Sequence, residues 1–251
     1  MHIVRRVVTT VILAITLVAL GFIAWANTPA GPTAEAFAAL KSTDAVKVSR
    51  DAQGRLLFEP VGARNGLGLV FYPGARIDPR AYAPLAIGIA AKGTVVVITP
   101  VTLNLAALSP ERAQDVIDSY QGIRGWTVGG HSLGGAVAAR FTLRHPAGIS
   151  GLVLWAACPF SADNLSTLSV PVLSIGASRD GLTTTAEIMT ARSLLPPTTT
   201  YVTIDGGNHA QFGSYGSQFG DRSATIEPSR QRELIIEATA GFLDTVAKQL
   251  P

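Results

Sequence analysis

The stretch Trp126-Thr127-Val128-Gly129-Gly130-His131-Ser132-Leu133-Gly134-Gly135 decides the fold of this chain. Its apolar start indicates the end of a buried strand, and apolar residues then recur at helical spacing from Leu133 to Phe141. Ser132 therefore lies on a strand-to-helix turn, where its hydroxyl projects from the edge of a sheet. The flanking glycines suit this turn because a Cβ would crowd it. The stretch predicts a nucleophile elbow.

Strand and helix patterns alternate on both sides of this turn. Compact Val/Ile/Leu-rich runs, typical of strands buried on both faces of a parallel sheet, are Leu67–Tyr72, Thr94–Thr99, Trp126–Val128, Gly151–Ala156, Val170–Ile175 and Tyr201–Ile204. Helical patterns cover Pro79–Lys92, Pro110–Tyr120, Leu133–Arg144, Thr184–Leu194 and Pro228–Gln249. The alternation predicts a single α/β domain, with a doubly wound, mostly parallel sheet and helices on both faces.

Two further segments refine this fold. Ala45–Val48 and Arg55–Phe58 alternate in polarity around Asp51-Ala52-Gln53-Gly54, which predicts a hairpin. Only Cys158–Ser169 separates the strand after the elbow helix from the next strand. Since this connection is too short for a lid domain, we expect an open active site.

The N-terminal segment has the length and composition of a membrane span. Residues 7–26 form 20 positions without a charge, directly after Arg5 and Arg6. At ~1.5 Å per residue they cover about 30 Å, the thickness of a bilayer's hydrocarbon core. We expect residues 1–26 to anchor the chain in a membrane, and the basic flank places the remainder on the extracytoplasmic side. A cleavable signal peptide is the alternative, because Ala24-Trp25-Ala26 offers a cleavage site.

The segment after the span joins it to the catalytic part. Residues 27–44 contain Pro29, Gly31 and Pro32 ahead of an alanine-rich stretch. They predict a tether that ends in a short helix. The α/β domain itself is expected over residues 45–251.

Composition excludes several classes of partner. Without Arg5 and Arg6, the remaining 18 basic and 17 acidic side chains nearly cancel, and no basic stripe is present, so we expect no nucleic-acid partner. The single cysteine, Cys158, excludes an intramolecular disulfide and a multi-cysteine metal site. We expect neither a metal nor an organic cofactor.

A serine nucleophile needs a base, and only four histidines are available. His2 precedes the apolar segment, His131 should point away from its neighbour along the turn, and His145 lies about 20 Å down the helix. His209 follows the strand Tyr201–Ile204 in a glycine-rich loop, at the carboxyl end where such sheets bind ligands. His209 is therefore the predicted base.

The third member must orient the histidine, and three aspartates compete for that role. Asp180 follows the strand Val170–Ile175 and also lies at a carboxyl strand end, so it is the preferred acid. Asp163 follows the preceding strand, and Asp205 stands four residues before the histidine. Both remain alternatives.

An oxyanion hole requires two hydrogen-bond donors. The backbone N–H of Leu133, the residue after the nucleophile, is the first. The second is expected from Pro73-Gly74-Ala75-Arg76, after the first buried strand, with the N–H of Ala75 preferred and that of Gly74 next. An ordinary proline-glycine turn is the alternative interpretation of these residues.

With Ser132, Asp180 and His209 in this order, the chain resembles the α/β-hydrolase superfamily over about residues 45–249. It looks most like the small, uncapped, dienelactone-hydrolase-like members, several of which carry an N-terminal anchor. The segments that carry the resemblance are Pro73–Pro79, Gly129–Gly135 and Gly206–Phe212. The resemblance implies Ser132 as nucleophile, His209 as base and Asp180 as acid. Dienelactone hydrolases proper use a cysteine, so Ser132 favours general ester chemistry over their lactone route.

These features predict a serine hydrolase that cleaves a carboxylic ester or related small acyl substrate through an acyl-enzyme. Acyl transfer or perhydrolysis on the same triad is one alternative. A hydrolase-shaped binding protein without activity is another, because a fold does not determine a function.

Overall fold

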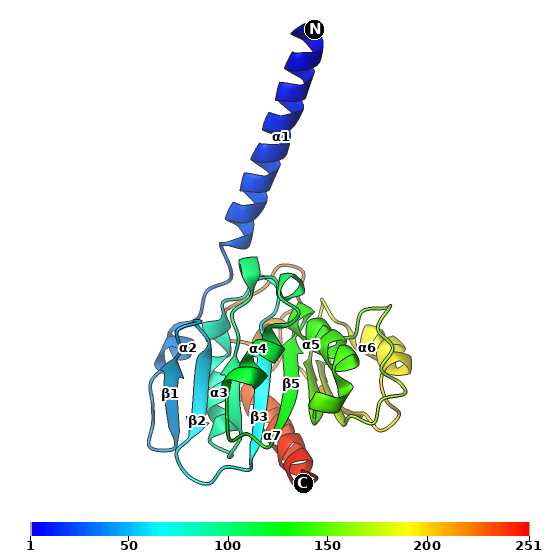
Figure 1. Cartoon of the computed structure of the whole chain (residues 1–251). Coiled ribbons are helices and arrows are strands. Elements are labelled where there is room, and N and C mark those ends of the chain that lie inside the picture. Colours follow the sequence, from blue (N-terminus) through cyan, green and yellow to red (C-terminus); the bar gives the residue numbers. More distant parts are fainter. Residues whose placement is uncertain (1, 251) are drawn as a thin grey trace.

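The computed structural model of the chain describes residues 2–250, which build an eight-stranded sheet (Figure 1). The strand order is β1-β2-β4-β3-β5-β6-β7-β8. β3 to β8 run parallel to their neighbours, whereas β1 and β2 form an antiparallel hairpin whose second strand pairs antiparallel with β4. The strands are β1 (Val46–Arg50), β2 (Leu56–Pro60), β3 (Leu67–Tyr72), β4 (Val95–Ile98), β5 (Gly125–His131), β6 (Gly151–Trp155), β7 (Val172–Ala177) and β8 (Thr200–Ile204).

Helices cover both faces of the sheet. One hydrophobic core lies between the sheet and the helices α3 (Ala83–Ala90) and α7 (Pro228–Ala247), and a second lies under α4 (Arg112–Ser119) and α5 (Leu133–Arg144). α6 (Thr185–Ala191) packs beside β7. Short 3₁₀ turns are η1 (Pro79–Tyr82), η2 (Thr102–Asn104), η3 (Ala106–Leu108), η4 (Pro146–Gly148), η5 (Arg192–Leu194) and η6 (Ala210–Phe212).

The fold class and the hairpin expected from the sequence are confirmed, and the differences lie at the ends of elements. The helical pattern that begins at Pro79 is divided into η1 and α3, because Pro84 has no N–H to donate and therefore belongs to a first helical turn. β7 begins after Pro171 for the same reason. β5 continues through Gly129 and Gly130, whose weak strand propensity hid its second half.

The parallel strands bring their carboxyl ends to one edge of the sheet. β3 and β5 pair from Leu67 with Gly125 to Tyr72 with Gly130, so the loops after both strands emerge side by side. The loops after β4, β7 and β8 leave the same edge. We call it the catalytic edge, because the elbow serine follows β5.

The N-terminal helix α1 (His2–Ala26) projects away from the domain (Figure 1). Its segment Val4–Ala26 has a mean hydropathy of 2.6 and is exposed up to Trp25, which is compatible with a membrane anchor or a signal sequence. The following residues contain the expected short helix, α2 (Ala34–Ala38). They lie against the domain, since Ala36 is buried and Glu35 pairs with Arg232 on α7 at 2.7 Å.

Candidate functional site

Ser132 forms the turn between β5 and α5. Its backbone has φ 53° and ψ −124°, a strained conformation for a residue with a side chain, and its N–H donates to the carbonyl of Trp155 at 3.0 Å. A Cβ at Gly130 would collide with the backbone of Gly134, and a Cβ at Gly134 would collide with the carbonyls that end β3. The elbow therefore requires glycine at both positions, and it leaves Ser132 partly exposed.

His209 and Asp180 meet on the neighbouring loops of the catalytic edge. His209 Nδ1 lies 2.8 Å from Asp180 Oδ2, and both side chains are fully buried. A carboxylate only accepts, so Nδ1 carries a proton, and the neutral form of the ring with that tautomer has its free electron pair at Nε2. Nε2 is buried and has no hydrogen-bond partner among the described residues. Asp180 Oδ1 accepts the N–H groups of Leu182 and Thr183, at 2.8 and 2.7 Å.

The other candidate acids and bases have different partners. Asp163 accepts from Arg140 Nε at 2.8 Å, and Asp205 accepts from the hydroxyl of Ser178 at 2.9 Å. His145 lies 2.9 Å from Glu111 beyond the far end of α5. The structure thus brings Asp180, and neither rival aspartate, to His209.

The two expected oxyanion donors lack acceptors within the chain. The N–H groups of Leu133 and Ala75 make no hydrogen bond with described residues. Gly74, the second candidate, donates its N–H to Tyr82 Oη at 2.9 Å and is therefore occupied. The loop after β3 lies against the start of α5, as the crowding around Gly134 shows. Ala75 is the donor that the geometry leaves available.

His131 contributes a buried support that sequence reasoning missed. Its ring packs 4.5 Å from that of His209, between centroids, and its Nδ1 lies 2.9 Å from Tyr82 Oη. Burial, with the neighbouring His209 as a second cause, lowers the pKa of His131 well below its usual value. Since Tyr82 Oη accepts from Gly74, its own proton is available to a neutral His131. The expectation that His131 points along the turn could not reveal this contact, which joins residues from three elements.

Asp221 and Gln231 also hold the site, and no sequence signal singled them out. Asp221 accepts the N–H of Gly181 at 3.0 Å with one oxygen and that of Ala210 at 2.8 Å with the other. It therefore joins the loop of the candidate acid to the loop of the candidate base. Gln231, buried on α7, exchanges two hydrogen bonds with the backbone of Asn208. Both are positioning residues because they touch only the supporting backbone.

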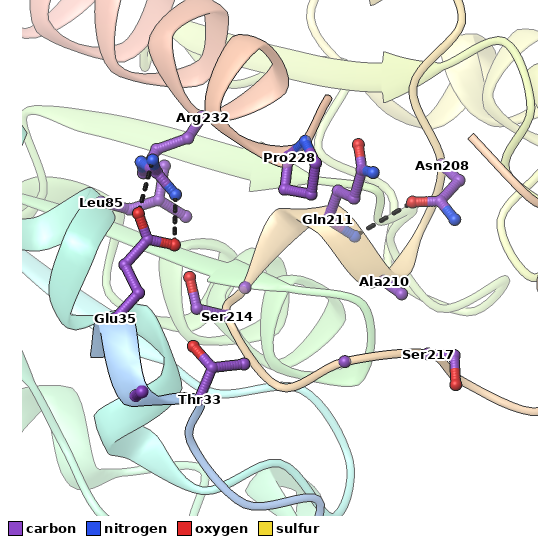
Figure 2. Close-up of a pocket in the computed structure, with 13 residues that line it drawn as sticks. Thr33, Glu35, Leu85, Asn208, Ala210, Gln211, Ser214, Ser217, Pro228 and Arg232 are labelled. Carbon is purple, nitrogen blue, oxygen red and sulfur yellow. Dashed lines mark hydrogen bonds and ion pairs between the residues drawn. The ribbon is translucent and has the colours of Figure 1, made fainter. Parts of the chain in front are cut away.

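A cavity of about 450 Å³ lies behind the histidine loop (Figure 2). Figure 2 shows Asn208 and Gln211 on one wall and the ion pair of Glu35 with Arg232 on the other. Ser132 is not among the residues that line the cavity.

The one cysteine lies apart from the candidate triad's hydrogen bonds. Cys158 is partly buried, and burial raises the pKa of its thiol to about 11, so the thiol stays protonated. Among residues 2–250, no group of three His, Cys, Asp or Glu side chains is arranged to hold a metal ion.

Comparisons with known proteins agree with this architecture. Residues 68–233 match the model of the alpha/beta hydrolase family. A dienelactone hydrolase from Anabaena variabilis is similar in structure, with a TM-score of 0.60 and 16% identity over 79% of this chain and 99% of that one. An esterase from Pyrobaculum calidifontis has a TM-score of 0.58 and 17% identity over 95% and 93%. A search of curated protein sequences found no match.

Proposed function

The chain belongs to the α/β hydrolase family, and from this premise we propose that it is a serine hydrolase that cleaves a carboxylic ester or related acyl substrate. Similar structures carry esterase and dienelactone hydrolase names, which supports ester chemistry. The observation that carries the proposal is the buried pair of His209 and Asp180, with His209 Nε2 unpartnered among the described residues, on the same edge of the sheet as the elbow serine.

In the proposed reaction, His209 Nε2 takes the proton of Ser132 as Oγ attacks the acyl carbon. Asp180 keeps the other ring proton on Nδ1 and stabilises the imidazolium that forms. The imidazolium then gives its proton to the departing alkoxide, which leaves as an alcohol. Water, deprotonated by His209, hydrolyses the acyl-enzyme and releases the acid.

The negative charge of each tetrahedral intermediate would be held by the N–H groups of Leu133 and Ala75. Both are free of other acceptors, and the first also lies at the positive end of α5. Removing one such donor typically lowers the rate by about 10²–10³. The support for this pair of donors is their place after β5 and after β3 and the absence of an acceptor for either N–H among the described residues.

The proposed location is the outer surface of a membrane, with α1 as an anchor and the catalytic domain on the extracytoplasmic side. Arg5 and Arg6 precede the apolar span and favour the cytoplasm. The small acyl substrate would then be met outside the cytoplasm.

Labelling with a fluorophosphonate tests the nucleophile. The full chain in detergent should be labelled, and Ser132→Ala should lose both the label and the turnover of a short-chain ester panel. Ser161→Ala, an exposed serine in the loop after β6, is the matched control and should retain both. Labelling of the Ser132→Ala variant would refute the assignment.

The same experiment separates the other classes of function. A folded wild-type chain with neither label nor turnover would favour a binding protein without activity. Product analysis with an added alcohol or hydrogen peroxide distinguishes hydrolysis from acyl transfer and perhydrolysis, because these acceptors yield a new ester or a peracid.

A further inference from the structure

The end of α1 is bound to the loop that carries the candidate oxyanion donor. Arg76, the residue after Ala75, donates from Nε to the carbonyl of Trp25 at 2.9 Å and from Nη2 to that of Thr28 at 2.7 Å. Its guanidinium also stacks on the Trp25 ring, 4.2 Å from the centroid. These contacts satisfy carbonyls at the end of α1, where a cation is favoured by the helix dipole.

A second loop of the catalytic edge, the one after β4, binds both the end of α1 and Arg76. Asn104, in η2 after β4, donates from Nδ2 to the carbonyl of Ala26 at 2.9 Å and accepts the N–H of Arg76 at 2.7 Å. Arg76, Leu103 and Asn104 are three of the five non-glycine residues with positive φ in residues 2–250. Backbone strain of this kind persists only where surrounding contacts hold it, so this is a built junction.

The chain after α1 then follows the same loop. Ala30 forms a parallel bridge with Ile77, with its N–H on the carbonyl of Arg76 at 2.7 Å and its carbonyl on the N–H of Asp78 at 3.0 Å. Between Trp25 and Ala30 the chain is therefore hydrogen-bonded to residues 76–78, which directly follow Ala75. The end of α1 is thus joined by hydrogen bonds to the loops after β3 and β4 at the catalytic edge.

Exposed apolar side chains lie on three loops of this edge. Residues 27–250 contain six exposed large hydrophobic side chains, and three of them, Leu108, Leu182 and Phe219, lie on the loops after β4, β7 and β8. Phe219 is fully exposed. Its loop abuts the loop of Asp180, because a Cβ at Gly181 would meet the Gly220 carbonyl at 2.6 Å.

Figure 1 shows α1 leaving the domain at the end where the loops after β4 gather. A span that crosses a bilayer must end at the bilayer's surface, so the loops bound to its end lie at that surface as well. Trp25, stacked by Arg76, stands at the position where aromatic residues meet the headgroups.

We infer that the junction holds the catalytic edge against the membrane surface, and that the substrate is an amphiphilic acyl ester of that surface. This inference rests on the proposed function and names its substrate class. Leu108, Leu182 and Phe219 would enter the headgroup region, where apolar side chains are stabilised by removal from water. An ester held in the outer leaflet then reaches Ser132 without leaving the bilayer.

The orientation is tested without any activity. A polarity-sensitive dye is attached to Leu108→Cys, Phe219→Cys or Val61→Cys, each in a Cys158→Ser full-length chain. Val61 is also exposed but follows β2, whose end lies at the opposite edge. In vesicles of equal parts phosphatidylcholine and phosphatidylglycerol, the emission at 108 and 219 should shift to shorter wavelength, and that at 61 should not.

Turnover tests the substrate class. We expect Phe219→Ser to slow hydrolysis of methylumbelliferyl oleate in those vesicles by about tenfold. Hydrolysis of dissolved methylumbelliferyl butyrate should change less than twofold, which excludes misfolding. Val61→Ser should leave both rates unchanged.

The outcomes separate this inference from the proposed function. If either dye at the catalytic edge stays in water, or if the mature chain begins at Asn27, the membrane orientation is wrong while serine labelling can still stand. If both rates fall together in Phe219→Ser, the substrate class is wrong. Absence of serine labelling would refute the proposed function, and the dye measurement would still decide the orientation.

Discussion

Asp180 binds the histidine with one oxygen and two backbone N–H groups of its own loop with the other. An amide in its place keeps this geometry but cannot accept from Nδ1 through its NH₂ group. We expect Asp180→Asn to lower ester turnover by up to ~10⁴, because the wrong histidine tautomer is then favoured. Steady-state kinetics on a short-chain ester measure the loss.

The rival aspartates provide the controls for that measurement. Asp163 and Asp205 have Arg140 and Ser178 as partners. Their change to asparagine should leave turnover nearly unchanged, because neither contacts His209. If Asp163→Asn lost turnover while Asp180→Asn retained it, the acid of the triad would be Asp163, in the loop after β6.

His131 should make stability depend on pH. Burial lowers the pKa of its folded form, so below about pH 6.5 the unfolded chain binds a proton that the folded chain does not. Stability is then constant above that pH and falls as the pH drops, by up to about 1.4 kcal/mol per unit. Thermal unfolding in detergent at neutral pH and at about pH 5 measures the change.

The matched variant for that measurement is His131→Gln, which retains a polar side chain beside Tyr82. Its stability should be lower at neutral pH, yet it should decline less than that of the wild type on acidification. An unchanged decline would assign the pH dependence to other groups.

At the scale of elements, α5 can begin where it does only because position 134 lacks a side chain. A Cβ there would meet the carbonyls of Tyr72 and Pro73, which are backbone atoms and cannot rotate away. We expect Gly134→Ala to destabilise the fold by about 1–3 kcal/mol or more.

Gly241 supplies the opposite case within α7. It is exposed, and a Cβ there would meet nothing within 4 Å. Gly241→Ala should therefore raise stability by about 0.5–1 kcal/mol, through a better helix propensity. Denaturation midpoints of the two variants should move in opposite directions, and a stable Gly134→Ala would contradict the close approach.

The bounds of a helix or strand could be predicted from the sequence where a local pattern of apolar residues determines them. β3 and α5 have the bounds expected from apolar runs and spacing, because burial on both faces or on one face leaves that pattern. The hidden half of β5 and the split before α3 depend on glycine and proline within otherwise regular runs. Pairing with β3 makes Gly129 and Gly130 part of β5, and the missing N–H of Pro84 places the start of α3.

At the scale of the whole molecule, we expect α1 to determine where the protein is found. Its span Val4–Ala26 is long and apolar, and it is exposed up to Trp25. If it stays attached, the full chain should remain with the membrane after an alkaline carbonate wash and dissolve only in detergent. Deletion of residues 2–26 should release the domain into the supernatant, whereas release of the full chain by carbonate would favour a cleaved signal.

The sequence by itself determined the fold class, the elbow and the order of the candidate triad. These depend on local patterns, in which strand ends, glycines and chemically active side chains are close along the chain. It left three aspartates open as the acid, because a sequence shows which loop carries a carboxylate but not where the side chain points.

Only the tertiary structure decided which groups meet. The pairing of Asp180 with His209, the clamp by Asp221, the occupied N–H of Gly74 and the junction of Arg76 with the end of α1 all join distant segments. Each depends on the order of strands in the sheet and on side-chain direction. No spacing along the chain encodes these, since they arise when the carboxyl ends of separate strands are packed against one another.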